Sequence, residues 1–93
     1  MKKTKLIPLD SPLYMKRVVR EVRRMMTAGK SVHIVVDSSP RKVVEVEIYK
    51  FSIRVRVAVD RRAFELRYVS ACGFRDCDGD EITASRTERN NDE

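Results

Sequence analysis

Apolar residues near the N-terminus recur at spacings of three and four, which is the pattern of a helix with one buried side. This apolar stripe consists of Leu13, Tyr14, Val18, Val22, Met25 and Met26. Ser11 and Pro12 are a favoured N-cap and a favoured first helical residue, and Gly29 suits a left-handed C-cap. The sequence therefore predicts one helix that begins at Pro12 and ends before Gly29. Residues 5–9 are expected to form a short edge strand or an extended segment.

After residue 29 the apolar positions alternate with polar ones, which is typical of half-buried strands. Four strands are predicted, at residues 31–37, 43–51, 52–60 and 63–71. Pro40 lies in a turn-rich segment and is expected to separate the first strand from the second. Residues 42–51 could instead form a helix, but their alternation of valine, isoleucine and glutamate favours a strand.

The pairing of the last three strands can be predicted from their alternation. If the hairpins turn at Phe51-Ser52 and at Arg61-Arg62, one face of the sheet is entirely apolar. Its rows are Val44, Val59 and Phe64; Val46, Val57 and Leu66; and Ile48, Val55 and Tyr68. The rows of the other face are Glu47, Arg56 and Arg67; Tyr49, Arg54 and Val69; and Glu45, Ala58 and Glu65. We therefore expect an α+β fold in which one basic amphipathic helix packs on a four-stranded antiparallel sheet.

Charge is divided unevenly along the chain. Residues 1–75 hold 18 Lys and Arg against 7 Asp and Glu, whereas residues 76–93 hold 2 against 7. This division predicts a single basic domain at 1–75 and an acidic, flexible tail at 76–93. A basic domain favours an anionic partner. No apolar stretch approaches the roughly 18 residues of a membrane span, so we expect a cytoplasmic protein without a membrane partner.

The composition is also poor in thermolabile amides. There is no Gln, Asn occurs only at positions 90 and 91, and Arg outnumbers Lys 13 to 7. These features are typical of proteins from hot habitats. A GC-rich genome would favour Arg and Val as well, so both interpretations stay open.

Two surfaces are candidates for contact with a polyanion. The first is the side of the helix opposite its apolar stripe, with Glu21 as its single acid and with the cations Lys16, Arg17, Arg20, Arg23 and Arg24. The second is the polar sheet face, with Tyr49, Phe51, Arg54, Arg56 and Arg67. Arginines interleaved with aromatic rings on an open sheet are typical of surfaces that pair phosphates and stack the bases of single strands.

The predicted register places Arg56 directly opposite Arg67 on that sheet face. Like charges facing each other across strands are destabilising, and a bound polyanion would relieve the repulsion. Glu47 in the same row could instead neutralise one arginine, which would make the face a solvated, ion-paired surface. The cations of the helix could likewise be no more than its solvated side.

Acidic residues near the C-terminus are weak candidates for a metal site. Asp76, Asp78 and Asp80 alternate as calcium ligands do, but Glu81 stands where a calcium loop needs Gly. Thr87 stands where the loop needs its final Glu. A two-metal nuclease would need further ligands that the chain lacks, so a turn or an acidic tail is the favoured interpretation.

The remaining chemistry-bearing residues indicate no catalytic site. Cys72 and Cys77 are too few for a zinc site of four cysteines, although they could form a disulfide. His33 is the only histidine, and a lone histidine in a strand is more often structural. No nucleophile with a nearby general base and no Gly-rich phosphate loop is present in the sequence. We expect no enzyme activity, no metal and no cofactor.

A short lead, one basic helix and a four-stranded sheet in a small Arg-rich chain without zinc ligands resemble the archaeal ThermoDBP family of single-stranded DNA-binding proteins. The resemblance covers residues 11–71 in the order of elements and in the basic and aromatic sheet face, and no short motif carries individual residues over. It implies binding of single strands in a cleft between sheet and helix, often by oligomers. The archaeal Alba chromatin proteins are similar in their first elements. Against Alba, Asp10 and Ser11 replace basic residues before the helix, and Arg61-Arg62 replaces a long hairpin arm.

The favoured hypothesis is a non-catalytic protein that binds single-stranded DNA or RNA with low sequence specificity. One helix cannot cover both faces of a sheet, so a homodimer or a higher homo-oligomer is expected. Three alternatives stay open. They are a small basic ribonuclease of the toxin kind, an Alba-like binder of double-stranded DNA or RNA, and a module that binds an acidic protein.

Overall fold

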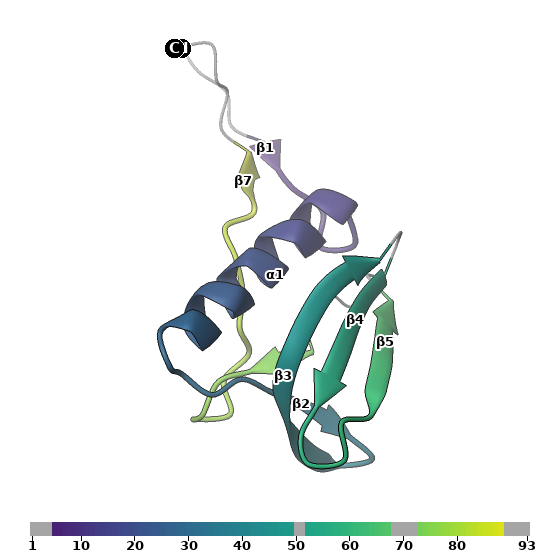
Figure 1. The fold of residues 1–93 in the computed structure, drawn as a ribbon. Helices are drawn as coiled ribbons and strands as arrows, with labels where there is room; N and C mark the ends of the chain where they lie inside the picture. Colours follow the sequence, from purple (N-terminus) through teal and green to yellow (C-terminus); the bar gives the residue numbers. More distant parts are fainter. Residues whose placement is uncertain (1–4, 50–51, 68–72, 89–93) are drawn as a thin grey trace.

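A computed structural model of the chain describes residues 5–49, 52–67 and 73–88, which form an α+β fold. Helix α1 (Pro12–Thr27) packs against one antiparallel sheet of five strands in the order β5-β4-β3-β2-β6 (Figure 1). The strands of the sheet are β2 (His33–Val36), β3 (Ser39–Tyr49), β4 (Ser52–Val57), β5 (Ala63–Arg67) and β6 (Phe74–Arg75). A separate ladder pairs β1 (Lys5–Leu6) with β7 (Thr87–Glu88). The sequence predicts four strands in the main sheet, and the fifth is the short strand β6.

Helix α1 begins and ends as the sequence predicts. The hydroxyl of Ser11 accepts a hydrogen bond of 3.1 Å from the amide of Tyr14, which satisfies one N–H of the first turn. Gly29 has a φ of 84°, and the amides of Gly29 and Lys30 donate to carbonyls of the last turn. This is the Schellman arrangement, in which a left-handed glycine lets the chain leave the helix at once.

The buried side of α1 includes two residues that the predicted apolar stripe lacks, and it excludes Leu13. It consists of Tyr14, Met15, Val18, Val19 and Val22. Met25 and Met26 are partly buried against the core, whereas Leu13 is 40% exposed, so its prediction as a core residue was wrong. Met15 and Val19 occupy the stripe in its place. Within the described ranges, no helix combines the length and the apolar character that crossing a membrane requires.

Strands β2 and β3 are joined by the tight turn Asp37-Ser38. Both residues have positive φ, 51° and 65°, as a type I′ hairpin turn requires. Strand β3 therefore begins at Ser39 and includes Pro40, which lies opposite Val35. The prediction that Pro40 separates two strands was wrong. At this position β3 has a neighbouring strand on one side only among the described residues, and an edge tolerates the missing N–H of proline.

Strand β3 changes its partner along its length. Residues 39–42 pair with β2, whereas residues 43–49 pair with β4. The change occurs at a bulge, because Val43 lies opposite Val57 while Glu45 lies opposite the next residue, Arg56. Val44 is the extra residue, and such a bulge bends a strand and increases its twist.

The register of β3, β4 and β5 differs from the predicted one. Val46 lies opposite Val55 instead of Val57, and Val55 lies opposite Phe64 instead of Tyr68. Tyr68 itself lies outside the described residues. From Glu45 onward each shift is an even number of residues, so Val46 and Val55 remain on the predicted apolar face. The bulge makes the shift odd at Val43, which is buried in place of Val44, so the prediction of Val44 in an apolar row was wrong.

Strand β4 is shorter than predicted and causes part of this shift. It ends at Val57, and the chain turns over residues 58–60 before β5 begins. Val59, predicted to lie in an apolar row, is 94% exposed in this turn. The carboxylate of Asp60 accepts a hydrogen bond from the amide of Arg62, which holds the longer connection in place.

The C-terminal segment packs against the domain. Phe74 and Ile82 are buried in the core, with 0% and 5% of their surface exposed. The guanidinium of Arg86 donates to the carbonyl of Ile7, and the amide of Ala84 donates to a side-chain hydroxyl of α1. The structure thus places residues 76–88 within the domain, whereas the sequence predicts a separate tail from residue 76. Within the acidic segment, the buried side chain of Ile82 anchors it to the core. Residues 89–93 lie outside the described residues.

Replacement of Ile82 by Ala should lower the free energy of unfolding by about 2–4 kcal/mol, because it removes buried apolar atoms and leaves a cavity. Urea denaturation measures this change. Thr83→Ala is the matched control. Thr83 is exposed, so this variant should have the same urea midpoint as the unaltered protein. An unchanged midpoint in Ile82→Ala would show that the segment does not contribute to the core.

Candidate functional site

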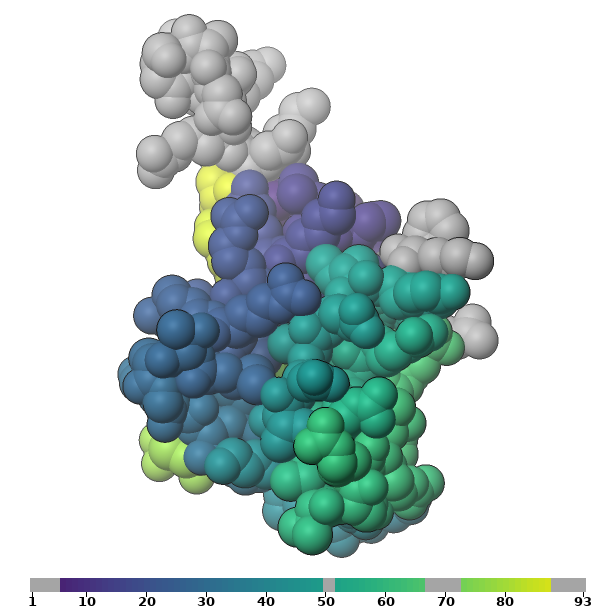
Figure 2. Space-filling view, in the orientation of Figure 1, coloured from purple at the N-terminus to yellow at the C-terminus, as the bar shows by residue number. Residues whose placement is uncertain are grey.

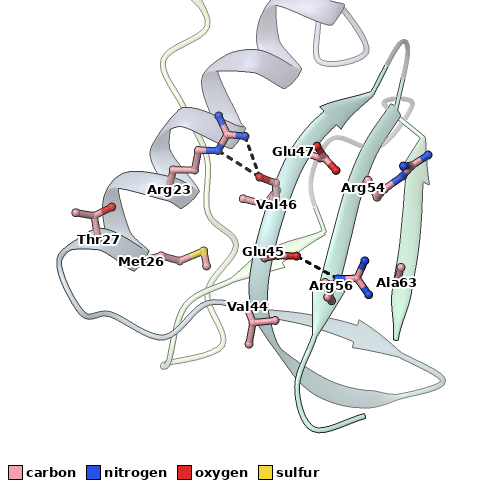
Figure 3. A pocket seen from close by; sticks show the side chains of 10 residues that line it. All are labelled: Arg23, Met26, Thr27, Val44, Glu45, Val46, Glu47, Arg54, Arg56 and Ala63. Carbon is pink, nitrogen blue, oxygen red and sulfur yellow. Dashed lines mark hydrogen bonds and ion pairs between the residues drawn. The ribbon is translucent and has the colours of Figure 1, made fainter. Parts of the chain in front are cut away.

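A groove of about 490 Å³ lies between α1 and the strands β3 and β4 (Figure 3). Its charged lining consists of Arg23 from α1, Glu45 and Glu47 from β3, and Arg54 and Arg56 from β4. In the space-filling view, the purple and blue surface of α1 lies directly beside the teal and green surface of these strands (Figure 2). The groove brings together three residues of the two predicted surfaces: Arg23, Arg54 and Arg56.

Arg23 links the helix to the edge of the sheet. Its Nε and Nη2 donate to the carbonyl of Val46 over 3.3 and 2.9 Å (Figure 3). Beyond residue 42, β3 has no neighbouring strand on the side opposite β4 among the described residues, so this carbonyl needs a donor from elsewhere. A carbonyl carries no net charge. Arg23 therefore stabilises the edge of β3 and remains a positive charge at the rim of the groove.

The polar face of β3, β4 and β5 places acids opposite its arginines. Its rows are Glu45, Arg56 and Ala63; Glu47, Arg54 and Glu65; and Tyr49, Ser52 and Arg67. The prediction that Arg56 faces Arg67 was wrong, because the shifted register brings Glu45 opposite Arg56. The Nε of Arg56 lies 3.1 Å from the carboxylate of Glu45, and its Nη1 donates to the carbonyl of Arg61. In this register Tyr49 lies opposite Ser52, whereas the predicted register places it opposite Arg54.

Tyr49 and Arg54 form a stacked pair at the end of β3. The guanidinium carbon of Arg54 lies 4.1 Å from the centroid of the Tyr49 ring, a cation–π contact. Tyr49 is 42% exposed. Phe51, the other aromatic residue of the predicted sheet surface, lies outside the described residues. Arg54 thus covers part of the ring that the sequence offers for base stacking.

Arg17 and Arg24 of the helix make contacts of different kinds. Arg17 Nη1 donates to the carbonyls of Ser85 and Thr87 over 3.1 and 2.9 Å. Arg24 donates to the carboxylate of Glu21 through Nε and Nη2. Since carbonyls carry no net charge, Arg17 holds the C-terminal segment without being neutralised. The charge of Arg24 is compensated by Glu21.

Lys16 and Arg20 complete the outer side of α1. Both are exposed, and neither makes an ion pair with any described residue. We call Lys16, Arg17, Arg20 and Arg23 the basic helix surface. Its four charges are compensated by no acid among the described residues, whereas the sheet side of the groove is neutral.

The acidic segment after β6 forms a turn, in agreement with one interpretation of the sequence. One carboxylate oxygen of Asp76 accepts hydrogen bonds from the amides of Asp78 and Asp80, both 2.9 Å long. The three side chains offer oxygens within 4.8 Å of one another. Cys77 in this turn is an exposed free thiol, and Cys72 lies outside the described residues.

No family model matches this sequence, and neither the curated proteins nor the solved structures contain a match. What the site can bind is therefore argued from the residues that form it. The site combines a positively charged helix surface, a groove whose sheet side is neutral, and an exposed aromatic ring stacked on arginine.

The contact between Glu45 and Arg56 should contribute little stability, because 65% of the Glu45 side chain and 39% of the Arg56 side chain are exposed. A double-mutant cycle with Glu45→Ala and Arg56→Ala should give a coupling energy of about 0.2–1 kcal/mol. Arg56→Ala alone should destabilise more than Glu45→Ala, since it also loses the bond to the Arg61 carbonyl. Equal losses in urea denaturation would contradict this assignment.

The hydrogen bond from the Arg24 guanidinium holds the pKa of the Glu21 carboxyl below its ordinary value. A lowered folded-state pKa stabilises the fold at pH values above the ordinary pKa, and this contribution is lost as the pH falls through the lowered value. An NMR titration of the Glu21 carboxyl should show the lowered pKa in the unaltered protein. In Arg24→Gln the pKa should return towards its ordinary value, and the same titration curve in both proteins would rule out Arg24 as the cause.

Proposed function

We propose that this protein is a non-catalytic, single-stranded nucleic-acid-binding protein of low sequence specificity, with DNA as the favoured ligand. The observation that carries the proposal is the basic helix surface, whose four cations are not neutralised by an acid among the described residues. Cations of this kind bind phosphates and release condensed counterions, which drives association. The resemblance of the sequence to the ThermoDBP family implies the same activity.

The charges of the groove favour one orientation of the strand. Glu45 and Glu47 offset the two arginines of the sheet side, which is neutral, whereas Arg23 and the exposed cations of α1 attract phosphates. The phosphates therefore follow the helix, and the bases turn towards the strands. This differs from the orientation that the sequence suggests, in which the sheet arginines hold the phosphates.

The stacked pair of Tyr49 and Arg54 supplies a surface for a base. A guanidinium plane stacks on bases as an aromatic ring does, so Arg54 can extend the stack that Tyr49 begins. Stacking does not distinguish strongly between bases, because every base has a π-face. A site built from stacking and phosphate contacts therefore binds with low sequence specificity and requires unpaired bases.

Self-association is part of the proposal. The edge of β5 has no neighbouring strand among the described residues, and no second helix of the described chain covers the outer face of the sheet. Free strand edges are common sites of pairing between chains. A homodimer or a higher homo-oligomer would join such edges.

Binding to a labelled single strand, followed by fluorescence polarisation at several salt concentrations, tests the proposal. Affinity should fall with salt, with a log–log slope of about −0.7 for each phosphate bound. Lys16→Gln and Arg20→Gln should each reduce the slope by about 0.7, because each removes one phosphate contact. A duplex of the same sequence should bind less tightly than the single strand.

Lys30→Gln is the matched control, since Lys30 is exposed and lies beyond the end of α1. It removes one charge from the protein and should leave the slope unchanged. A slope near zero in the unaltered protein would contradict the proposal. Cleavage of an RNA strand during the same incubation would instead favour the ribonuclease hypothesis.

A further inference from the structure

A row of three basic side chains crosses the sheet at its other end. His33 on β2 lies opposite Lys42 on β3 and also opposite Arg75 on β6. Residues that face each other across antiparallel strands project from the same side of the sheet. Lys42, His33 and Arg75 therefore form one row, which we call the basic row.

The basic row contains no acid. Lys42 and Arg75 are exposed, and His33 between them is half-buried. Arg75 Nη1 donates to the carbonyl of Gly79, while Lys42 makes no ion pair with any described residue. Lys42 and Arg75 flank His33 on either side, and both charges attract an anion bound beside the row.

Two hollows adjoin His33, and they differ in charge. The hollow towards β6, of about 430 Å³, is lined by Arg75 and also by Asp76 and Asp78, whose carboxylates repel an anion. The hollow towards β4, of about 450 Å³, is lined by His33 and Lys42 together with Arg41 and Asp60. Asp60 is the one acid that lines this hollow, and its carboxylate lies 3.6 Å from Arg41 Nη1, so its charge is compensated. The second hollow is therefore the one that suits an anion.

We infer that Lys42 and His33 bind a phosphate of the same nucleic-acid strand that occupies the groove, an inference that rests on the proposed function. Lys42 and Glu45 are three residues apart on β3, about 10 Å at the rise of a strand. A nucleic-acid strand that leaves the groove and follows β3 therefore reaches Lys42 next. Besides the imidazole of His33, the hollow has no aromatic ring among its lining residues, and its two basic side chains that pair with no described acid suit a phosphate better than a base.

Oligonucleotides of two lengths distinguish binding at this subsite from binding in the groove. Oligothymidylates of about 6 and about 20 nucleotides serve as probes, in the range of single-strand site sizes. Lys42→Gln should reduce the salt slope by about 0.7 with the long strand and leave the short strand unaffected. His33→Gln should weaken binding of the long strand only. Lys30→Gln, which removes the same charge as Lys42→Gln, should change neither strand, and thermal melting confirms that each variant is folded.

Each outcome decides between the two proposals. An unchanged long-strand slope in Lys42→Gln, with normal binding by the unaltered protein, overturns the subsite and leaves the groove in place. If Lys42→Gln reduces the salt slope equally for the short and the long oligonucleotide, Lys42 belongs to the groove site, and the proposal of a separate subsite is overturned. Absence of binding by the unaltered protein overturns the proposed function and the subsite together.

Discussion

Strand β3 pairs with two different strands along its length, and the remainder of the structure depends on how it does so. The bulge at Val44 shifts the pairing by one residue, which allows Val43 and Val46 to be buried although they lie three positions apart. Residues 39–42 of β3 pair with β2, which also pairs with β6, and residues 43–49 pair with β4, which also pairs with β5. The second part leaves an edge towards α1, and Arg23 supplies the donor that this edge lacks. The groove and the basic row lie on either side of the bulge.

Local chemistry explains which parts of the fold were predictable. The helix boundaries are fixed by Ser11 and Gly29, whose side-chain and backbone properties act within a few residues. The faces of the strands follow from alternation, which any even shift preserves. The register depends instead on hairpin length, and alternation does not encode that length. The packing of the C-terminal segment depends on Ile82, a buried apolar residue that an acidic composition conceals.

In the candidate site too, features that depend on local spacing were predictable and features that depend on strand register were not. The cations of α1 were predictable because helical spacing places them together, and the structure leaves four of them uncompensated by any described acid. The predicted repulsion between Arg56 and Arg67 depended on register and was wrong. The basic row was not predictable, because it requires β6, a strand of two residues that carries no alternation. Cross-strand chemistry is therefore the part of this site that only the structure supplies.

The ladder of β1 with β7 has a consequence for folding kinetics. Its pairs, Lys5 with Glu88 and Leu6 with Thr87, join residues from opposite ends of the described chain. Closing so long a loop has a high entropic cost, and two residue pairs return little of it, so this ladder should form after the sheet and open before it. Its amide protons should exchange early through local opening, while those of the buried strands should require global unfolding. The same proximity of residues 5 and 88 makes the fold suited to circular permutation, with new ends in an exposed turn such as Asp37-Ser38.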